Sequence, residues 1–471
     1  MKSFFVAVIA FGTAAGPLLA GPLFDDYLNP VRPGSDTGPG SEQAVASARS
    51  PLGQTFSVEG GVGEVYRIGL RPVYETWEPG ETVTLTLYTS PDRKQKLASY
   101  AIEEATSHVQ PIHNTKDCVL YWHLRAPTQG RTSFYFELTV AGGNEQVAFQ
   151  AMPQQKGLSY VVHIKPVADR EANLRRFFTE RLDIDRPELA EVKKAVQAGD
   201  WEEAIARTAM HFHQRQELWA DYAAVLQEKP RLDADTELAD LIMSNRFRHV
   251  ETKQPVPWRP EDYWVPEFKT ERAQPKRGAE PSVYTWHIDR CLAAAYTHTG
   301  KAEYARRAID LRMQFILDNP NPKLTGVPWY FELWNDRTAA ARAPGHGLLP
   351  YLRLYHYDGW TNDERLVFFS FLEDNARWDY QADSGANWGA EAARACYEFG
   401  LKFPEWKMSS EYVRWGTNRL AEIVLADVRG DGTSTEAAIK YHAMVARRLK
   451  GMLQDHVEGR IRLDDDILGR L

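Results

Sequence analysis

The first third of the chain is patterned for short β-strands. Between residues 54 and 168, four stretches alternate between apolar and polar residues or run apolar over a short length, and turn sequences such as PGE and AGGNE separate them. A period of two buries one face of each strand, and short strands at this spacing are typical of a two-sheet sandwich. The stretches read VYRIGL, ETVTLTLYTS, CVLYWHL and TSFYFELTV. The pattern predicts an antiparallel β-sandwich of jelly-roll type over residues 54–168.

This predicted sandwich is also a candidate carbohydrate-binding module. Three of its aromatic residues, Trp77, Trp122 and Tyr135, could stack on sugar rings or could be ordinary core residues. The sequence leaves both interpretations open.

From residue 169 onward the apolar pattern changes to the period of a helix. Amphipathic segments follow one another in pairs with short connections, for example around Gly300, and Pro320 follows the second helix of that pair. Antiparallel helix pairs form bundles, solenoids or rings, and the absence of a fixed repeat period favours a ring. We therefore predict a multidomain α+β protein, with a helical domain over residues 169–471 after the sandwich.

The two N-terminal segments are predicted to lie outside these domains. Residues 1–20 contain a lysine, a short apolar run and then small residues, which is typical of a secretory signal peptide. An uncleaved membrane anchor is the alternative. Residues 21–53 are rich in Pro, Gly and Ser and are predicted to be a linker. We expect a periplasmic or secreted protein that is not inserted in a membrane after signal cleavage.

The composition excludes several classes of function. The formal net charge of −8 argues against a general nucleic-acid binder, and three scattered cysteines are too few for a disulfide framework or a zinc site. Asp427 and Asp431 faintly resemble a calcium loop, but Arg429 and Ala438 occupy ligand positions. We therefore expect neither a metal nor another cofactor. The oligomeric state is not predicted.

Three segments between helices carry the residues best suited to chemistry: residues 326–346, 384–391 and 429–442. Asn387 is a natural helix N-cap, and the same position suits binding of a carboxylate by free N–H groups. Glu391, one turn later, could face the same cleft or could favour the helix dipole. Glu436 has capping-box spacing, so a structural role is as reasonable for it as a catalytic one.

The order of several short blocks resembles the polysaccharide lyases of the heparinase II/III and alginate-lyase kind. The blocks read WHIDR, ELWNDR, GANW, FPEW and DGTSTEAAIKYH, and the resemblance covers about residues 170–460. It implies an incomplete (α/α) toroid. Residue by residue, Asn387 matches the family's asparagine, Tyr441 its tyrosine and Glu436 its acidic residue. Trp388 stands where many members have histidine, which puts a histidine base at that position in doubt. Such lyases also have a C-terminal β-domain, so we expect this chain to be truncated.

The resemblance implies an acidic polysaccharide as substrate and β-elimination as the reaction. A base removes the C5 proton of a uronic acid, and the C4–O bond breaks. Asn387 would neutralise the sugar carboxylate as charge develops, and Tyr441 would act as acid, or also as base where cations lower its pKa. The further candidates are His442 for catalysis and, for substrate binding, Arg337, Arg342, Trp334, Trp388, Glu391 and His346.

Two other functions remain open from the sequence. The first is a non-catalytic or incomplete polysaccharide-binding protein. The second is a glycoside hydrolase on an (α/α) toroid, which needs two carboxylates about 5–10 Å apart. Candidate carboxylates for the hydrolase are Asp336, Asp431, Glu391 and Glu436.

Overall fold

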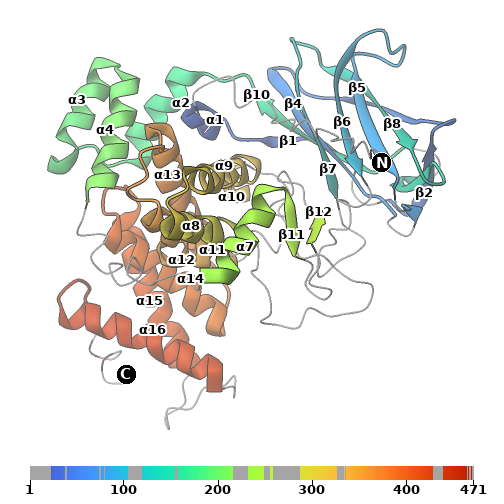
Figure 1. Cartoon of the computed structure of the whole chain (residues 1–471). Helices are drawn as coiled ribbons and strands as arrows, with labels where there is room; N and C mark the ends of the chain where they lie inside the picture. Colours follow the sequence, from blue (N-terminus) through green and yellow to red (C-terminus); the bar gives the residue numbers. More distant parts are fainter. Residues whose placement is uncertain are drawn as a thin grey trace, which may run out of the picture.

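The computed structural model has an N-terminal β-sandwich and a larger helical body (Figure 1). It describes residues 23–37, 40–73, 76–78, 80–103, 119–153, 157–215, 232–248, 255–257, 287–325, 334, 336–427, 439–463, 465 and 468. The predicted signal peptide, residues 1–20, lies outside the described residues. Within the described part of the chain, no helix is both long and apolar enough to cross a bilayer.

The sandwich consists of two four-stranded sheets and a short ladder, and every described pairing is antiparallel. The pattern of burial follows the predicted alternation, because Val83, Leu85 and Leu87 are fully buried between polar neighbours of the same strand. The first sheet has the order β1 (Arg32–Asp36), β10 (Tyr160–Pro166), β4 (Val62–Leu70), β7 (Leu120–Pro127); the second has the order β3 (Leu52–Ser57), β8 (Ser133–Ala141), β5 (Thr82–Tyr88), β6 (Lys96–Glu103); β2 (Glu42–Ser47) pairs with β9 (Gln146–Ala151).

The predicted linker over residues 21–53 is wrong for its described part. These residues form a short helix, α1 (Leu23–Leu28), the strands β1 and β2, and the start of β3. Strand β1 reads RPGSD and has no apolar alternation, yet it pairs with β10 at the edge of the first sheet. Backbone groups make a sheet ladder, so a polar edge strand leaves no hydrophobic signal in the sequence.

The helical body consists mainly of antiparallel helix pairs, as predicted. Gly199 and Gly300 both adopt a φ of 70° at the turns of two such pairs, a conformation that favours glycine. The pairs form an incomplete (α/α) toroid. Its elements are α2 (Arg170–Arg176), a π-helical turn η4 (Phe177–Arg181), η5 (Pro187–Leu189), α3 (Ala190–Ala198), α4 (Trp201–Gln214), α7 (Leu232–Met243), the hairpin β11 (Arg246–Arg248) and β12 (Pro255–Pro257), α8 (His287–Thr299), α9 (Ala302–Asp318), α10 (Pro322–Thr325), α11 (Asp336–Arg342), α12 (Pro344–Arg353), α13 (Asn362–Asp379), α14 (Ala386–Lys402), α15 (Ser409–Asp427) and α16 (Ile439–Val457).

Helix α13 runs through the middle of the helical body, and most of its residues are buried on every side. It begins with a capping box. The Thr361 hydroxyl accepts a hydrogen bond from the Glu364 backbone N–H at 3.2 Å, and the Glu364 carboxylate accepts one from the Thr361 N–H at 2.8 Å. Because α13 is buried all round, its polar residues must find partners inside the protein.

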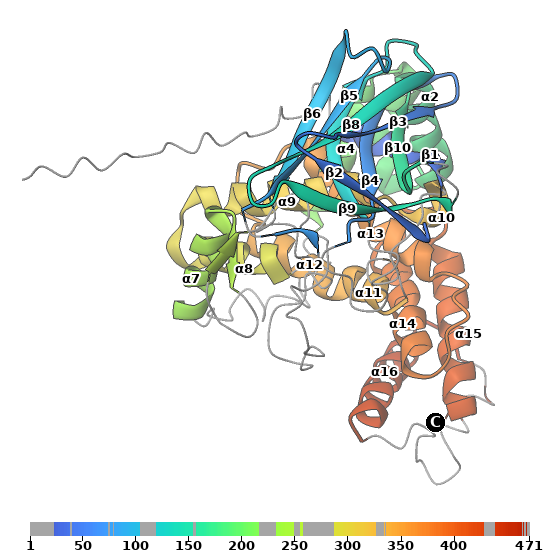
Figure 2. The same ribbon diagram turned by 90° about the vertical axis from the view of Figure 1, so that its right-hand side faces the viewer.

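Helices α14 and α15 pack unusually closely because a glycine lies at their contact. A Cβ atom at Gly416 would lie 2.4 Å from the backbone oxygen of Ala393. A residue with a side chain would therefore force the two helices apart. Figure 2 shows this pair with α16 beside it, at the end of the helical body that carries the C-terminus.

A polar interface joins the first sheet of the sandwich to the helical body. Tyr66 donates a hydrogen bond to the Asp318 carboxylate, and Arg67 donates one to the Asp318 backbone oxygen at 3.0 Å. Arg67 also donates to Nδ1 of His163 at 2.9 Å. Burial, and then the charge of Arg67, hold the pKa of His163 well below its ordinary value. An ion pair of 2.8 Å between Lys165 and Asp26 adds a second polar link.

Candidate active site

Asn387 lies in the first turn of α14, two positions after the N-cap, so the prediction that Asn387 is itself the N-cap is wrong. The helix begins at Ala386, and Gly385 is its N-cap, which makes no side-chain capping bond. Asn387 is 9% exposed, and no described residue hydrogen-bonds its side-chain amide. The amide lies beside the partial positive charge of a helix N-terminus.

The loop that leads into α14 is fixed from the neighbouring helix. Arg419 of α15 donates a hydrogen bond to the backbone oxygen of Ser384 at 2.9 Å and a longer one to that of Asp383 at 3.4 Å. Gln381, at the start of this loop, has a φ of 61°. A side chain inside a well-held first turn has little freedom to move, which is what a substrate-positioning group requires.

Helices α14 and α16 run in the same direction. Position 451 on α16 lies against the Tyr397 hydroxyl of α14, where an added Cβ would be 3.7 Å away. Further along, Asp455 of α16 is close enough to Glu398 and Lys402 of α14 to interact with their charges. Successive positions on α16 therefore meet successive positions on α14.

The first turn of each helix precedes this contact along the chain. Asn387 precedes Tyr397 by ten residues, and Tyr441 precedes Gly451 by the same number. Ten residues of helix span about 15 Å in both cases. The backbones at 387 and 441 are therefore offset equally from the contact. The side chains of Tyr441 and His442 lie outside the described structure.

Glu391 faces along α14 and forms an ion pair with Arg394 at 3.1 Å. Arg394 in turn pairs with Glu398 at 2.6 Å. Although burial by itself lowers the pKa of Arg394, the charges of Glu398 and Glu391 raise it above its ordinary value. The charge of Glu391 is thus balanced within the helix. Trp388, next to Asn387, is half-buried.

Arg342 and Trp334, both predicted to bind substrate, are buried together in the helical body. Trp334 is 2% exposed and Arg342 is fully buried. The guanidinium of Arg342 lies 4.8 Å from the Trp334 ring centre and donates a hydrogen bond from Nε to the Asn375 amide oxygen of α13 at 2.9 Å. The ring of Trp334 also packs on Phe371. In this arrangement neither side chain is open to a polymer in solvent, and their contacts are those of core packing.

Two of the three aromatic residues that were sugar-stacking candidates in the sandwich are also buried in a core. Trp77 is 4% exposed and Trp122 is fully buried, so these two are core residues. Tyr135 is half-buried on the outer side of strand β8. Of the remaining candidates, Arg337 lies on α11 and His346 on α12, but their side chains lie outside the described structure, as does all of Glu436.

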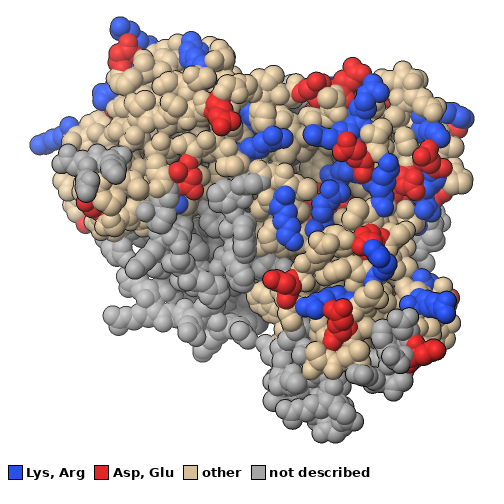
Figure 3. Space-filling model, turned by 180° about the vertical axis from the view of Figure 1, so that it is seen from behind, with Lys and Arg blue, Asp and Glu red and all other residues tan. Residues whose placement is uncertain are grey.

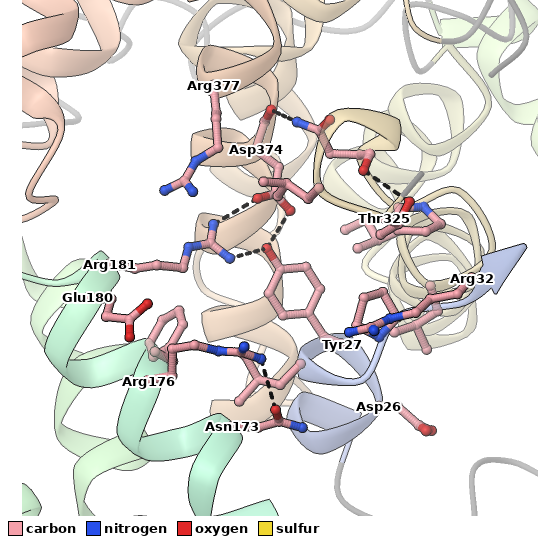
Figure 4. A pocket seen from close by; sticks show the side chains of 18 residues that line it. Asp26, Tyr27, Arg32, Asn173, Arg176, Glu180, Arg181, Thr325, Asp374 and Arg377 are labelled. Carbon is pink, nitrogen blue, oxygen red and sulfur yellow. Dashed lines mark hydrogen bonds and ion pairs between the residues drawn. The ribbon is translucent and has the colours of Figure 1, made fainter. Parts of the chain in front are cut away.

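A cavity of about 250 Å³ lies on another side of α13 (Figure 4). Arg181 reaches into it and donates hydrogen bonds to the Tyr27 hydroxyl at 3.1 Å and to Asp374 at 2.8 Å. Tyr27 donates to the other oxygen of Asp374 at 2.5 Å. Sequence reasoning missed this group, because Tyr27, Arg181 and Asp374 come from three distant segments. The polar run EDNAR in an otherwise apolar helix was its one signal.

The charges of Arg181, Glu373 and Asp374 are matched within this group. Arg181 also pairs with Glu373, and Arg377 pairs with the same carboxylate at 2.9 Å. Burial raises the pKa of Asp374, although Arg181 lowers it, and Arg181 and Arg377 together hold the pKa of Glu373 below its ordinary value despite burial. The group therefore joins α1, η4 and α13, and we assign it a structural role.

Over the described residues of the face in Figure 3, basic and acidic side chains are intermixed. Among the described residues, no three His, Cys, Asp or Glu side chains come together in a way that could hold a metal ion.

Comparison with known proteins identifies the relatives of the helical body. Residues 177–459 match the model of the Heparinase II/III N-terminus family. A heparin-sulfate lyase of Bacteroides thetaiotaomicron is 22% identical over 271 residues, which are 56% of this chain and 38% of that protein. The chain thus spans about two fifths of the length of this curated relative.

A solved structure shows the same fold. The crystal structure of heparinase III is 18% identical and has a TM-score of 0.51 over 63% of this chain and 46% of that one. A mutant heparan sulfate lyase from Pedobacter heparinus is 17% identical and has a TM-score of 0.48 over 63% and 46% of the two chains. Because the family model matches more than half of the sequence, the chain belongs to the Heparinase II/III N-terminus family.

Proposed function

We propose that this chain is a polysaccharide lyase that cleaves a uronic-acid-containing polysaccharide by β-elimination. The supporting observation is that the family match covers both Asn387, in the first turn of α14, and Tyr441, in the first turn of α16. The relative from Bacteroides is a heparin-sulfate lyase, so heparan sulfate is the first substrate to test. A secretory signal in residues 1–20 would bring the enzyme to polymers outside the cytoplasm.

In the proposed mechanism, the amide of Asn387 hydrogen-bonds the carboxylate of the sugar. This interaction strengthens as the C5 proton leaves and negative charge develops on the carboxylate oxygens, so it lowers the barrier. The N-terminus of α14 adds partial positive charge at the same point. The electron pair from the C5–H bond forms the C4–C5 double bond, the C4–O bond breaks, and Tyr441 donates a proton to the departing oxygen.

The base is assigned to Tyr441 itself or to its neighbour His442. A tyrosine can take both roles in succession, because the proton that it removes from C5 can be passed to the leaving oxygen. Its ordinary pKa of about 10 must then be lowered by nearby cations. The His442→Ala variant distinguishes the two assignments, because it loses activity only if the imidazole takes the proton. Glu436, just before α16, would cap the helix that carries Tyr441.

The test follows unsaturated product by its ultraviolet absorbance during incubation with heparan sulfate. We expect Asn387→Ala to lower kcat about 10²- to 10³-fold, the cost of losing one donor to a developing oxyanion. Tyr441→Phe should abolish elimination, because only the hydroxyl is lost. The matched controls are Asn362→Ala, which changes another asparagine in the first turn of a helix, and Tyr357→Phe, and both should keep wild-type rates.

Three outcomes would overturn the proposal. New reducing ends without the absorbance would indicate a hydrolase. Retention on a heparan sulfate column without cleavage would indicate a binding protein. Wild-type rates in either Asn387→Ala or Tyr441→Phe would remove that residue from the mechanism.

A further inference from the structure

The second sheet of the sandwich has one face in the core and one face directed away from the helical body (Figure 1). On β8, the inward residues Phe134, Phe136 and Leu138 are fully buried. The outward residues of β5 are three threonines followed by Tyr88, and those of β8 include Tyr135. The outward side chains are therefore small and polar, except at one end of the face, where the two tyrosines lie.

Tyr135 lies over the backbone of strand β3. A Cβ atom at Gly53 would be 1.7 Å from the Tyr135 hydroxyl oxygen and 2.3 Å from its ring carbon Cζ. Glycine is thus required at position 53 for the phenol to lie in this place. The ring rests along the sheet instead of projecting from it, as aromatic residues do when they cover a glycine on a neighbouring strand.

Tyr88 extends this aromatic surface. It is the direct cross-strand partner of Tyr135, and the two ring centres are 6.3 Å apart with a tilt of 38° between the planes. Arg93 forms an ion pair with Glu137, and the Tyr135 hydroxyl donates a hydrogen bond to the same carboxylate at 3.4 Å. The two rings are thus supported by a neighbouring strand, by each other and by an ion pair. We call Tyr88 and Tyr135 the tyrosine pair.

Two cations that have no carboxylate partner among the described residues flank the tyrosine pair. Lys96 is the cross-strand neighbour of Tyr88 on β6, it is exposed, and it forms no ion pair with any described residue. Arg131, in the turn before β8, donates hydrogen bonds only to the neutral amides of Gln129 at 2.8 Å and Gln95 at 3.3 Å. The uncompensated charge beside the rings is therefore positive.

We propose that the tyrosine pair, with Lys96 and Arg131, is a binding site for an acidic oligosaccharide, separate from the catalytic helices. Aromatic faces stack against the C–H faces of sugar rings, and the two cations attract carboxylate or sulfate groups on the same chain. The choice of heparan sulfate as the ligand rests on the proposed function, whereas the existence of the site is argued from the side chains of the second sheet. The site would keep the enzyme on a long acidic chain between cleavage events.

The test measures retardation of the full chain by native electrophoresis in gels that contain heparan sulfate or neutral dextran. We expect heparan sulfate alone to retard the protein, and salt to weaken the effect. Tyr88→Ala and Tyr135→Ala should each weaken binding about tenfold, as truncation of an aromatic anchor does. Tyr135→Phe should bind normally because the ring remains. The paired variant Lys96→Ser/Arg131→Ser should bind heparan sulfate more weakly.

The controls separate this site from catalysis and from misfolding. Thr84→Ala and Thr139→Ala change a cross-strand pair on the same face and should bind as the wild type does. The Tyr88→Ala variant carries the test even if Tyr135→Ala weakens the sheet, because Tyr88 does not cover a glycine. Repeating the gel with Asn387→Ala keeps the two proposals distinct. Slower elimination with unchanged retardation is expected if both proposals hold, whereas wild-type elimination with unchanged retardation counts against the proposed mechanism alone.

Wild-type retardation in Tyr88→Ala and Tyr135→Ala would overturn the proposed site. Equal retardation by dextran would show a neutral-sugar site instead. A change of mass with protein concentration that is lost in Tyr88→Ala would show that the face binds a second copy of the chain.

Discussion

Arg181 offers the sharpest test of how the fold is held together. Its guanidinium donates to the Ser370 backbone oxygen at 3.2 Å, to Asp374 at 2.8 Å and to Glu373, and it lies over the rings of Phe177 and Trp406. The change to test is Arg181→Met, which keeps most of the side-chain volume and removes the charge.

The size of the destabilisation follows from the buried carboxylates that lose their cation. Glu373 and Asp374 are buried, and without Arg181 they keep only Arg377 as a nearby cation. Breaking a buried ion pair by removing one partner costs about 3–5 kcal/mol. That is a large fraction of the about 5–15 kcal/mol by which a domain is stable, and it lowers the Tm by about 2–4 °C for each kcal/mol.

The assay is denaturant and thermal unfolding at two pH values. In the variant the pKa values of Glu373 and Asp374 rise, because burial is no longer opposed by Arg181. A carboxyl with a raised folded-state pKa contributes stability below its unfolded pKa and loses it as the pH rises through the folded value. The loss of unfolding free energy in Arg181→Met relative to wild type should therefore shrink as the pH falls from 7 toward 5. Arg175→Met, at an exposed ion pair with Glu171, should cost less than about 0.5 kcal/mol. An Arg181→Met protein within about 1 kcal/mol of wild type at pH 7 would refute the reasoning.

Two further predictions concern the sandwich and the helix pair. His163 is held neutral by burial and by Arg67, so below its ordinary pKa of about 6.5 the unfolded chain binds a proton that the folded chain does not. Wild type should lose up to about 1.4 kcal/mol per pH unit relative to His163→Gln as the pH falls from 6.5 to 5, measured by denaturant titration. Gly416→Val should cost about 1–3 kcal/mol or more, because its side chain would overlap Ala393, whereas Gly60→Ala, in open space, should cost less than about 0.5 kcal/mol in the same thermal assay.

The sequence predicted the fold well where a pattern is local. The helix boundaries near Gly300 and Gly199 followed from glycine at the turns, and the alternation of Thr82–Tyr88 followed from burial of one strand face. Strand β1 was missed because an edge strand is held by backbone bonds alone. The linker prediction failed for that reason.

The candidate site was harder to predict, because burial depends on the whole fold. Nothing in the local sequence distinguishes Trp334, which is in the core, from a tryptophan on the surface. The ion group of Arg181 and Asp374 joins residues that are 193 positions apart. The roles of Asn387 and Tyr441 stay predictions.

Because of helix α1, the sandwich is attached to the helical body at both of its ends. The Phe24 backbone N–H donates to Asp363 at 3.1 Å, and the Phe24 ring packs edge-on against Phe177, so the chain is anchored in the helical body before it enters β1. After the sandwich, the chain passes from β10 into α2 and so returns to the helical body. The sandwich is therefore an insertion between two parts of the helical body, connected to it by two segments of the chain instead of one. Cutting the chain at residue 168 would therefore remove α1, with its contact to Phe177, from the helical body. The tyrosine pair is carried by a domain that the chain both enters from and leaves to the helices.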